Sequence, residues 1–317
     1  MMKRTYKILN YVVATAILAF LLNYLISNWQ KISQHEFDLN VSYLVLSVFA
    51  YSLVLILLSL VWRKVIGTID GEHKISKIVA AKIYMLSEFG KYMPGKVWTI
   101  LGRIYLGNQS GISKKTLLVA SSIDALLSPI ATVLIGVLAL FISLSISLDQ
   151  GNSSLYILSV IVLIAGALLL HPRIMYPCFN FVLRKVGRAE IEKGSQLSYK
   201  QIARLFFFYT LIALGGGLCF VLFVASLSPT TISSLPALIA AFSLSRALGI
   251  AAPFAPSGLG VREGVMSVIL GFGTFASISV FISFSARLWS TAAEVLALGI
   301  TYLANLVFYR VTSVNIN

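Results

Sequence analysis

The chain has 317 residues, of which 58% are apolar and only 11% are charged. Soluble globular domains carry about 25% charged residues, so a soluble enzyme and a disordered chain are both excluded. Its 25 basic residues outnumber its 11 acidic ones, and the formal net charge is +14. Because the basic residues lie between apolar runs of about 20 residues, a length that crosses a bilayer, they indicate an anionic lipid partner and no nucleic acid.

Metal and redox chemistry have no support in the sequence. The chain contains two cysteines and three histidines. Cys178 and Cys219 stand far apart, and no pair of histidines has the spacing that metal ligands use. We therefore expect no disulfide framework, no metal and no other cofactor.

The first two apolar runs set the expected orientation. Three basic residues precede the run 8–28, which ends without a signal-peptide cleavage site and is therefore predicted to be a retained helix. The next run, 41–62, is followed at once by Arg63 and Lys64. The positive-inside rule then places the N-terminus in the cytoplasm.

The apolar stretch that follows, residues 78–107, is interrupted by charges and by the pair Pro94-Gly95. A simple lipid-facing helix does not tolerate such a sequence, because each polar group in hydrocarbon needs a partner. Residues 88–103 are therefore predicted to form a broken or re-entrant segment. A second broken segment is predicted at 253–263, where Pro256, Gly258 and Gly260 follow an apolar run.

Residues 172–204 carry seven basic residues against two acidic ones, which predicts the main cytoplasmic loop. The other apolar runs are 116–148, 153–170, 205–227, 235–251, about 264–283 and 286–308. The sequence thus predicts an all-α, polytopic transmembrane helix bundle of roughly eight membrane elements. We expect residues 1–317 to form a single integral membrane domain in the cell (inner) membrane. The two matched breaks are also typical of an inverted repeat.

Charged residues within the predicted membrane segments need compensation, because each costs about 2.5–3.5 kcal/mol at a helix centre. The basic ones are Lys82, Lys91, Lys96, Arg103, Arg246, Arg262 and Arg287. The acidic ones, which we expect to balance charge or to relay protons, are Glu88, Asp124, Glu263 and Glu294. Structural ion pairs and side chains that reach the membrane surface are the alternative explanations for these charges.

A broken helix exposes backbone amides, and an adjacent guanidinium completes a site that suits a phosphate oxyanion. Both breaks have this pattern, with Pro94 and Gly95 before one set of basic residues and Pro256, Gly258 and Gly260 before the other. We expect the two segments to approach each other near the membrane centre and to form one site. The predicted headgroup-binding residues are Arg103, Arg262, Arg287 and Lys96.

The run from Pro256 to Gly264, Pro-Ser-Gly-Leu-Gly-Val-Arg-Glu-Gly, is the most specific motif. Together with the run from Glu88 to Trp98 and with Arg103, it resembles the membrane region of the lysylphosphatidylglycerol synthase family, often called flippase-like. The resemblance implies the handling or movement of anionic or polyprenyl-phosphate lipids. Some members of that family fuse this membrane region to a cytosolic aminoacyltransferase domain, and others fuse it to a glycosyltransferase domain. This chain ends at Asn317 with neither, so the transferase activity is not carried over.

The preferred hypothesis is a protein that binds an anionic phospholipid or a polyprenyl-phosphate-linked lipid and flips it across the membrane. One alternative is an accessory subunit or embedded transferase that presents a lipid acceptor for cell-envelope glycan or aminoacyl-lipid synthesis, with a separate transferase as partner. Another is a small-solute transporter. No catalytic Ser/His/Asp set or nucleotide-binding loop is found, so an enzyme is the weaker hypothesis. The lipid, the energy source and the oligomeric state stay open.

Overall fold

The computed structural model describes residues 39–71, 75–93, 97–147, 197–252, 255–273 and 275–314, with isolated residues outside these ranges. The described chain is all-helical, as the sequence predicts. Four helices are long: α3 (Val41–Asp70), α6 (Lys114–Ser147), α9 (Tyr199–Ala225) and α12 (Ser279–Val314). Four are shorter: α4 (Lys77–Glu88), α5 (Trp98–Gln109), α10 (Leu235–Ala251) and α11 (Val261–Gly271). Short 3₁₀ turns are η1 (Phe89–Tyr92), η3 (Ile232–Ser234), η4 (Pro256–Gly258) and η5 (Ala276–Ile278).

Five described segments are long and apolar enough to cross a membrane: α3, α6, α9, α10 with η3, and α12 with η5. Their outer faces carry large exposed apolar side chains, such as Phe49 on α3, Phe207 on α9 and Leu288 on α12. Such a surface is stable only against lipid. The protein is therefore a multi-pass membrane protein. The predicted segments 8–28 and 153–170 and most of the loop 172–204 lie outside the described residues.

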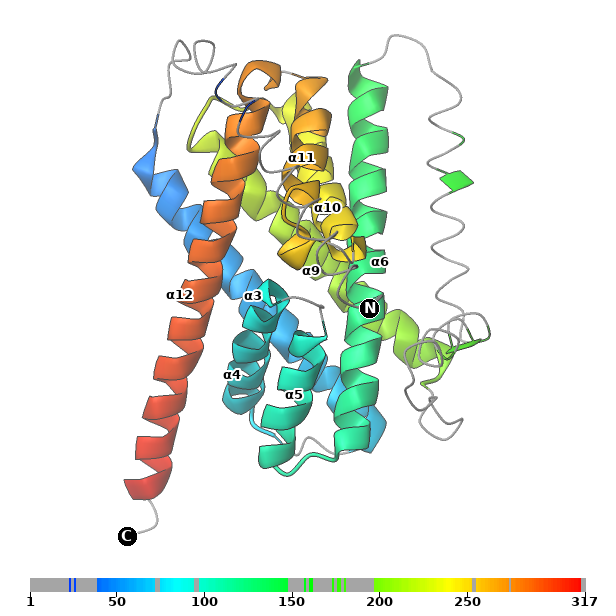
Figure 1. The fold of residues 1–317 in the computed structure, drawn as a ribbon, viewed down its shortest axis with the longest axis vertical. Helices are drawn as coiled ribbons and strands as arrows, with labels where there is room; N and C mark the ends of the chain where they lie inside the picture. Colours follow the sequence, from blue (N-terminus) through cyan, green and yellow to red (C-terminus); the bar gives the residue numbers. More distant parts are fainter. Residues whose placement is uncertain are drawn as a thin grey trace, which may run out of the picture.

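Two helical hairpins meet end to end in the middle of the molecule. In Figure 1 the pair α4–α5 occupies the lower half and the pair α10–α11 the upper half, and their connections face each other. The turns η1 and η4, which belong to these connections, are in contact. At about 1.5 Å per residue, the 12 residues of α4 and of α5 span only about 18 Å. Neither α4 nor α5 crosses the roughly 30 Å hydrocarbon core alone.

The boundary between the last two helices differs from the prediction. The sequence predicts separate segments at about 264–283 and 286–308, whereas α11 ends at Gly271 and α12 continues without a break from Ser279. The connection is made of small and apolar residues, so hydropathy does not fall where the chain turns. Arg287 lies inside α12, and its charge is satisfied by neighbouring groups of the second hairpin.

Helix starts follow from local sequence. Asn40, Ser76 and Ser113 each accept a hydrogen bond from a backbone N–H in the first turn of α3, α4 and α6. Ser198 and Gln201 form a reciprocal capping box at the start of α9. These caps satisfy amides that have no partner within the helix.

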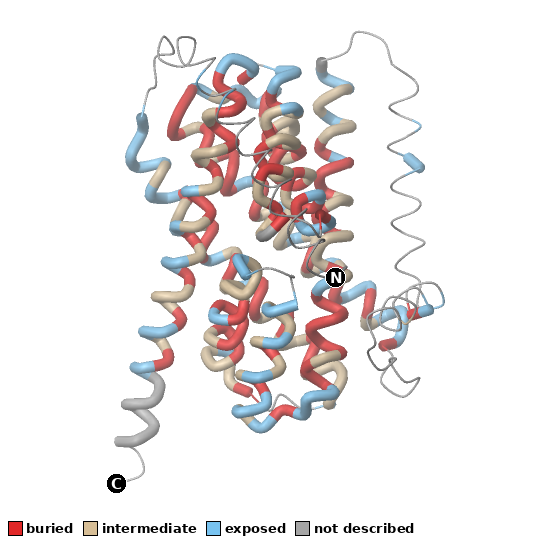
Figure 2. The backbone as a smooth tube through the Cα atoms, in the orientation of Figure 1, coloured by how far each residue is buried: buried red, intermediate tan, exposed pale blue. Residues whose placement is uncertain are grey.

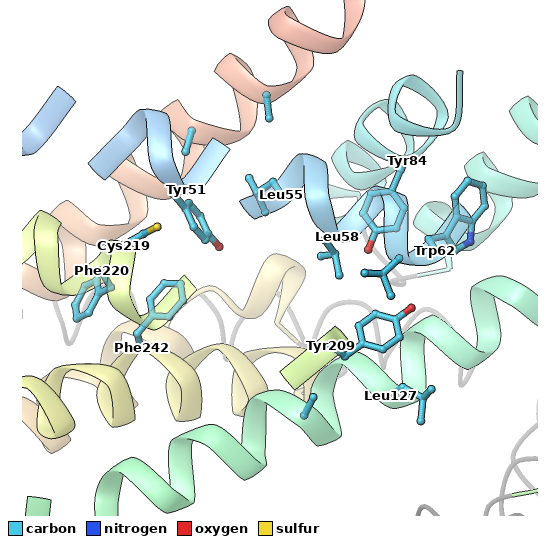
Figure 3. Packing of buried hydrophobic residues seen from close by; sticks show 14 of the residues in the cluster. Tyr51, Leu55, Leu58, Trp62, Tyr84, Leu127, Tyr209, Cys219, Phe220 and Phe242 are labelled. Carbon is cyan, nitrogen blue, oxygen red and sulfur yellow. The ribbon is translucent and has the colours of Figure 1, made fainter. Parts of the chain in front are cut away.

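Buried residues concentrate where the helices face one another (Figure 2). Aromatic side chains of α3, α9, α10 and α12 stack in the core, with Tyr51 and Trp289 separated by 4.6 Å between ring centroids. Phe220 and Phe242 stack at 5.3 Å in the same group. Figure 3 shows this apolar packing continuing along α3 to Trp62. These aromatic contacts thus pack α3, α9, α10 and α12 against one another.

The second connection requires Gly258, and this gives a test of the fold. Its φ is +70°, and an added Cβ would lie 2.7 Å from Cα of Gly249 on α10. A left-handed conformation costs a non-glycine residue about 1–2 kcal/mol, before the clash is counted. Gly258→Ala is expected to lower the thermal unfolding temperature of the purified protein.

Gly264→Ala on α11 is the matched control, because nothing lies within 4 Å of its added Cβ. Alanine is favoured over glycine inside a helix by about 1 kcal/mol, so this variant should be as stable as the parent or more so. Equal stability of the two variants would contradict the described connection.

Candidate functional site

A cavity of about 220 Å³ lies at the junction of the two hairpins. Drug-sized ligands occupy sites of roughly 300–1,000 Å³, so this cavity suits a headgroup-sized part of a larger molecule. Side chains from α3, α4, α5, α6, α10, α11 and α12 and from both connections line it. Its charged lining residues are Glu88, Lys91, Arg103, Asp124, Arg246, Arg262 and Glu294.

Arg103 is held in place by two carboxylates. Its guanidinium lies 2.6 Å from Glu88 Oε1 on α4 and 2.6 Å from Asp124 Oδ2 on α6. Asp124 also accepts hydrogen bonds from the hydroxyls of Tyr84, at 3.2 Å, and Tyr209, at 2.5 Å. Both hydroxyls point to the same place in Figure 3. Arg103 of α5 thus joins α5 to α4 within the first hairpin and joins this hairpin to α6.

A second ion pair joins the first connection to the last helix. Lys91 Nζ lies 2.5 Å from Glu294 Oε1, and the hydroxyl of Tyr92 donates to Glu294 Oε2 at 2.9 Å. Gly90 allows η1 to pack closely against the start of α5, because an added Cβ would lie 2.7 Å from the Thr99 nitrogen. The first connection therefore contacts α12 through Lys91 and Tyr92 and contacts the start of α5 through Gly90.

Arg287 and Glu263 organise the second connection. Glu263 accepts a hydrogen bond from the backbone N–H of Gly260 at 2.7 Å, which caps the start of α11. Arg287 donates to the carbonyl of Ser257 at 3.1 Å and to Glu263 at 3.3 Å. Ser257 has a φ of +52°, a conformation that a non-glycine residue rarely adopts, and this carbonyl contact helps to hold it.

Arg246 and Arg262 differ from the other cations of the cavity. Among the described residues, neither forms an ion pair with a carboxylate, although Arg246 donates to the hydroxyl of Tyr51. The stem of Arg262 passes over Gly249, where an added Cβ would lie 2.3 Å from its Cγ. Gly249 is three residues after Arg246 on α10, so these positions are neighbours on one helix face. The two guanidinium groups therefore line the same side of the cavity.

The structure brings five of the predicted site residues into the cavity wall: Glu88, Arg103, Asp124, Arg262 and Glu294. Arg287 and Glu263 do not line the cavity but pair with each other beside the second connection. Gly258 and Gly260 have the positive φ values that this connection needs. Pro256 begins η4. The other three predicted residues, Pro94, Gly95 and Lys96, lie outside the described residues.

Arg246 and Lys91 line the cavity, although the sequence predicts them only as intramembrane charges and not as residues of the site. Arg246 has a signal that could have identified it, since it is the one charged residue in the apolar segment 235–251. Lys91 gave no such signal, because its partner Glu294 is 203 residues away. Within the described ranges, no group of three or more His, Cys, Asp or Glu residues is placed to hold a metal ion.

Replacing Arg103 tests the buried network. Arg103→Gln removes the cation and leaves Glu88 and Asp124 uncompensated, and breaking a buried ion pair in this way costs about 3–5 kcal/mol. We expect a lower unfolding temperature, and partial recovery when Asp124→Asn is added. The exposed Arg204→Gln is the control. An Arg103→Gln protein as stable as this control would contradict the network.

Comparison with known proteins agrees with the resemblance seen in the motifs. The family model described as the lysylphosphatidylglycerol synthase TM region matches residues 8–309, which includes both hairpins and every residue of the cavity. A search of curated proteins returns no match. Since the match spans nearly the whole sequence, the chain belongs to the lysylphosphatidylglycerol synthase transmembrane-region family.

Proposed function

We propose that this protein binds the phosphate of an anionic or polyprenyl-phosphate lipid between its two hairpins and helps the lipid headgroup to cross the membrane. The observation that carries the proposal is the pair Arg246 and Arg262, two cations at one cavity wall without a carboxylate partner among the described residues. Membership of a family related to lipid handling supports it.

The charge of the cavity agrees with such a ligand. Its described lining holds four cationic and three anionic side chains, which leaves an excess of one positive charge. An arginine in a low-dielectric site is costly unless an anion compensates it, and phosphate accepts charge-assisted hydrogen bonds from guanidinium groups. A phosphodiester, with a single negative charge, matches this excess.

In this proposal the remaining charged residues position the site. Arg103 fixes the first hairpin, and Arg287 with Glu263 fixes the second, so that Arg262 reaches the cavity. Arg103 and Arg287 were predicted to bind the headgroup directly. Their guanidinium groups bond to carboxylates in the described structure, so we propose direct phosphate contact mainly for Arg246 and Arg262.

We further propose that the lower end of the molecule in Figure 1 faces the cytoplasm of a cell whose inner membrane holds the protein. Lys114 begins α6 on that side, and Arg63 and Lys64 lie in the half of α3 that leads to it, whereas the connections 226–234 and 272–278 at the opposite end contain no charged residue. By the positive-inside rule, this distribution supports the proposed orientation, in which the end of α12 lies on the cytoplasmic side.

Cysteine labelling tests this orientation in intact cells. In a background with Cys178→Ala and Cys219→Ala, an impermeant thiol reagent is expected to label Ser233→Cys from outside. Lys114→Cys should be labelled only after the membrane is opened. Both positions are exposed in the structure. The reverse pattern would invert the proposed orientation.

The phosphate-binding role is tested with Arg262→Gln. Since Arg262 has no described carboxylate partner, its removal strands no buried anion, and we expect normal expression and unfolding temperature. Loss of a charge-assisted hydrogen bond of about 1.5–3 kcal/mol should weaken phospholipid binding roughly 10- to 150-fold. Lipid co-purification and titration with phosphatidylglycerol measure this loss. Arg204→Gln, which removes one positive charge at an exposed position, should bind normally.

Unchanged lipid binding by a stable Arg262→Gln protein would contradict the proposed role.

Reconstitution separates flipping from the alternatives. The purified chain alone should move a fluorescent phospholipid between leaflets of proteoliposomes. A requirement for a second protein would favour the accessory role, and solute uptake without lipid movement would favour a solute transporter.

A further inference from the structure

The hydroxyl of Ser121 is buried at the cavity without a hydrogen-bond partner. Ser121 lies on α6 and lines the cavity, and its fully buried Oγ has no partner among the described residues. Serines elsewhere in the described helices satisfy this group locally. Ser47, Ser52 and Ser87 each donate to the carbonyl three residues earlier. A buried polar atom without a partner is rare and costly, so the Ser121 hydroxyl suits a partner that a ligand brings.

Two more hydroxyls line the same side of the cavity. Ser128 follows Ser121 by seven residues, about two helical turns, so both lie on one face of α6 with Asp124 between them. Thr99 lies on α5, which packs against α6. Ser128 also lines a smaller adjoining cavity together with Arg246. The hydroxyls of α5 and α6 therefore adjoin the cationic side of the cavity.

The carboxylates beside these hydroxyls leave one acceptor for a ligand. Asp124 accepts hydrogen bonds from three groups, on Arg103, Tyr84 and Tyr209. Glu88 accepts one bond in the described part of the chain, on Oε1, and its side chain is 26% exposed at the cavity wall. Its Oε2 can therefore accept a hydrogen bond from a ligand. Hydroxyls that donate and accept, together with this carboxylate oxygen, suit a ligand that carries hydroxyl groups.

The charge of the cavity limits what else the headgroup can carry. The described lining has an excess of one positive charge, which the phosphodiester of the proposed lipid matches. An amine on the headgroup would restore this excess within a low-dielectric site, whereas a hydroxyl adds no charge. The headgroup that fits best therefore offers hydrogen bonds and no charge beyond that of its phosphate.

We propose that Thr99, Ser121, Ser128 and Glu88 form a second subsite of the cavity, which binds the hydroxyl groups of a lipid headgroup next to the phosphate. The substrate class is then a phosphodiester lipid with a neutral, hydroxyl-bearing headgroup, such as a glycerol or a sugar. This deepens the proposed function and rests on it. The two arginines bind the charge that all phosphodiester lipids share, and the hydroxyl subsite selects among these lipids.

Two lipids of equal charge test the inference. Phosphatidylglycerol and phosphatidylmethanol are both phosphodiesters with a single negative charge, but only phosphatidylglycerol has hydroxyls on its headgroup. For the full chain in detergent, we expect phosphatidylglycerol to bind more tightly, by roughly 2- to 13-fold for each hydrogen bond formed. Phosphatidylethanolamine, which carries an amine, should bind more weakly than phosphatidylglycerol.

Ser121→Ala is the decisive variant. It removes a hydroxyl that has no described partner and strands no other group, so expression and unfolding temperature should match those of the parent. Its preference for phosphatidylglycerol over phosphatidylmethanol should fall by roughly 2- to 13-fold, because only phosphatidylglycerol loses a bond.

Ser243→Ala on α10 is the matched control. Ser243 is equally buried, and its Oγ also lacks a partner among the described residues, but it does not line the cavity. This variant removes the same atom from the same kind of environment. It should keep the lipid preference of the parent.

Three outcomes overturn the inference: equal affinity of the parent for the two anionic lipids, an undiminished preference in Ser121→Ala, or tighter binding of phosphatidylethanolamine than of phosphatidylglycerol. Arg262→Gln distinguishes these failures from failure of the proposed function. If it weakens the binding of both anionic lipids while the parent shows no preference, the phosphate site stands and the hydroxyl subsite alone is wrong. If it leaves both unchanged, the phosphate site fails, and the subsite fails with it.

Discussion

The cost of a charge in hydrocarbon determines how this molecule is built. Seven charged side chains of the described residues meet at one cavity, and two more lie directly behind it. No single helix can compensate so many charges, so the groups that satisfy them come from helices far apart in the sequence. Arg103 joins α4, α5 and α6, Lys91 joins η1 to α12, and Arg287 joins α12 to the second connection. The ion pairs thus fix the relative positions of both hairpins.

Three glycines allow the close packing around the cavity that the ion pairs require. Gly249 leaves space for the stem of Arg262, and Gly90 and Gly258 allow backbone segments to approach within distances that a Cβ would prevent. Each of these glycines lies at or beside a broken segment. The conformations of the two connections therefore depend on Gly90 and Gly258 as well as on the charged residues. The position of the Arg262 side chain depends on Gly249.

Much of the architecture follows from hydropathy and from the Pro/Gly breaks. The run 116–148 matches α6 within two residues at each end, whereas α3 extends eight residues beyond the run 41–62 and α9 begins six residues before the run 205–227. Each predicted break overlaps a gap between helices, from α4 to α5 and from α10 to α11. The start of α12 was misplaced because residues 271–278 turn without becoming polar. The need of the intramembrane charges for partners was also predictable. The identity of those partners was not, because the contact between Lys91 and Glu294 joins positions 203 residues apart and depends on how the hairpins pack.

α12 holds both connections at once. Glu294 binds the first hairpin, and Arg287, seven residues earlier on the same helix, binds the second. Seven residues rise about 10 Å along a helix, so the two attachment points lie two turns apart on α12. A sliding or tilting motion of α12 therefore acts on both hairpins together. The two hairpins are therefore mechanically linked through this helix, and either hairpin can move away from α12 by itself only if its own attachment breaks.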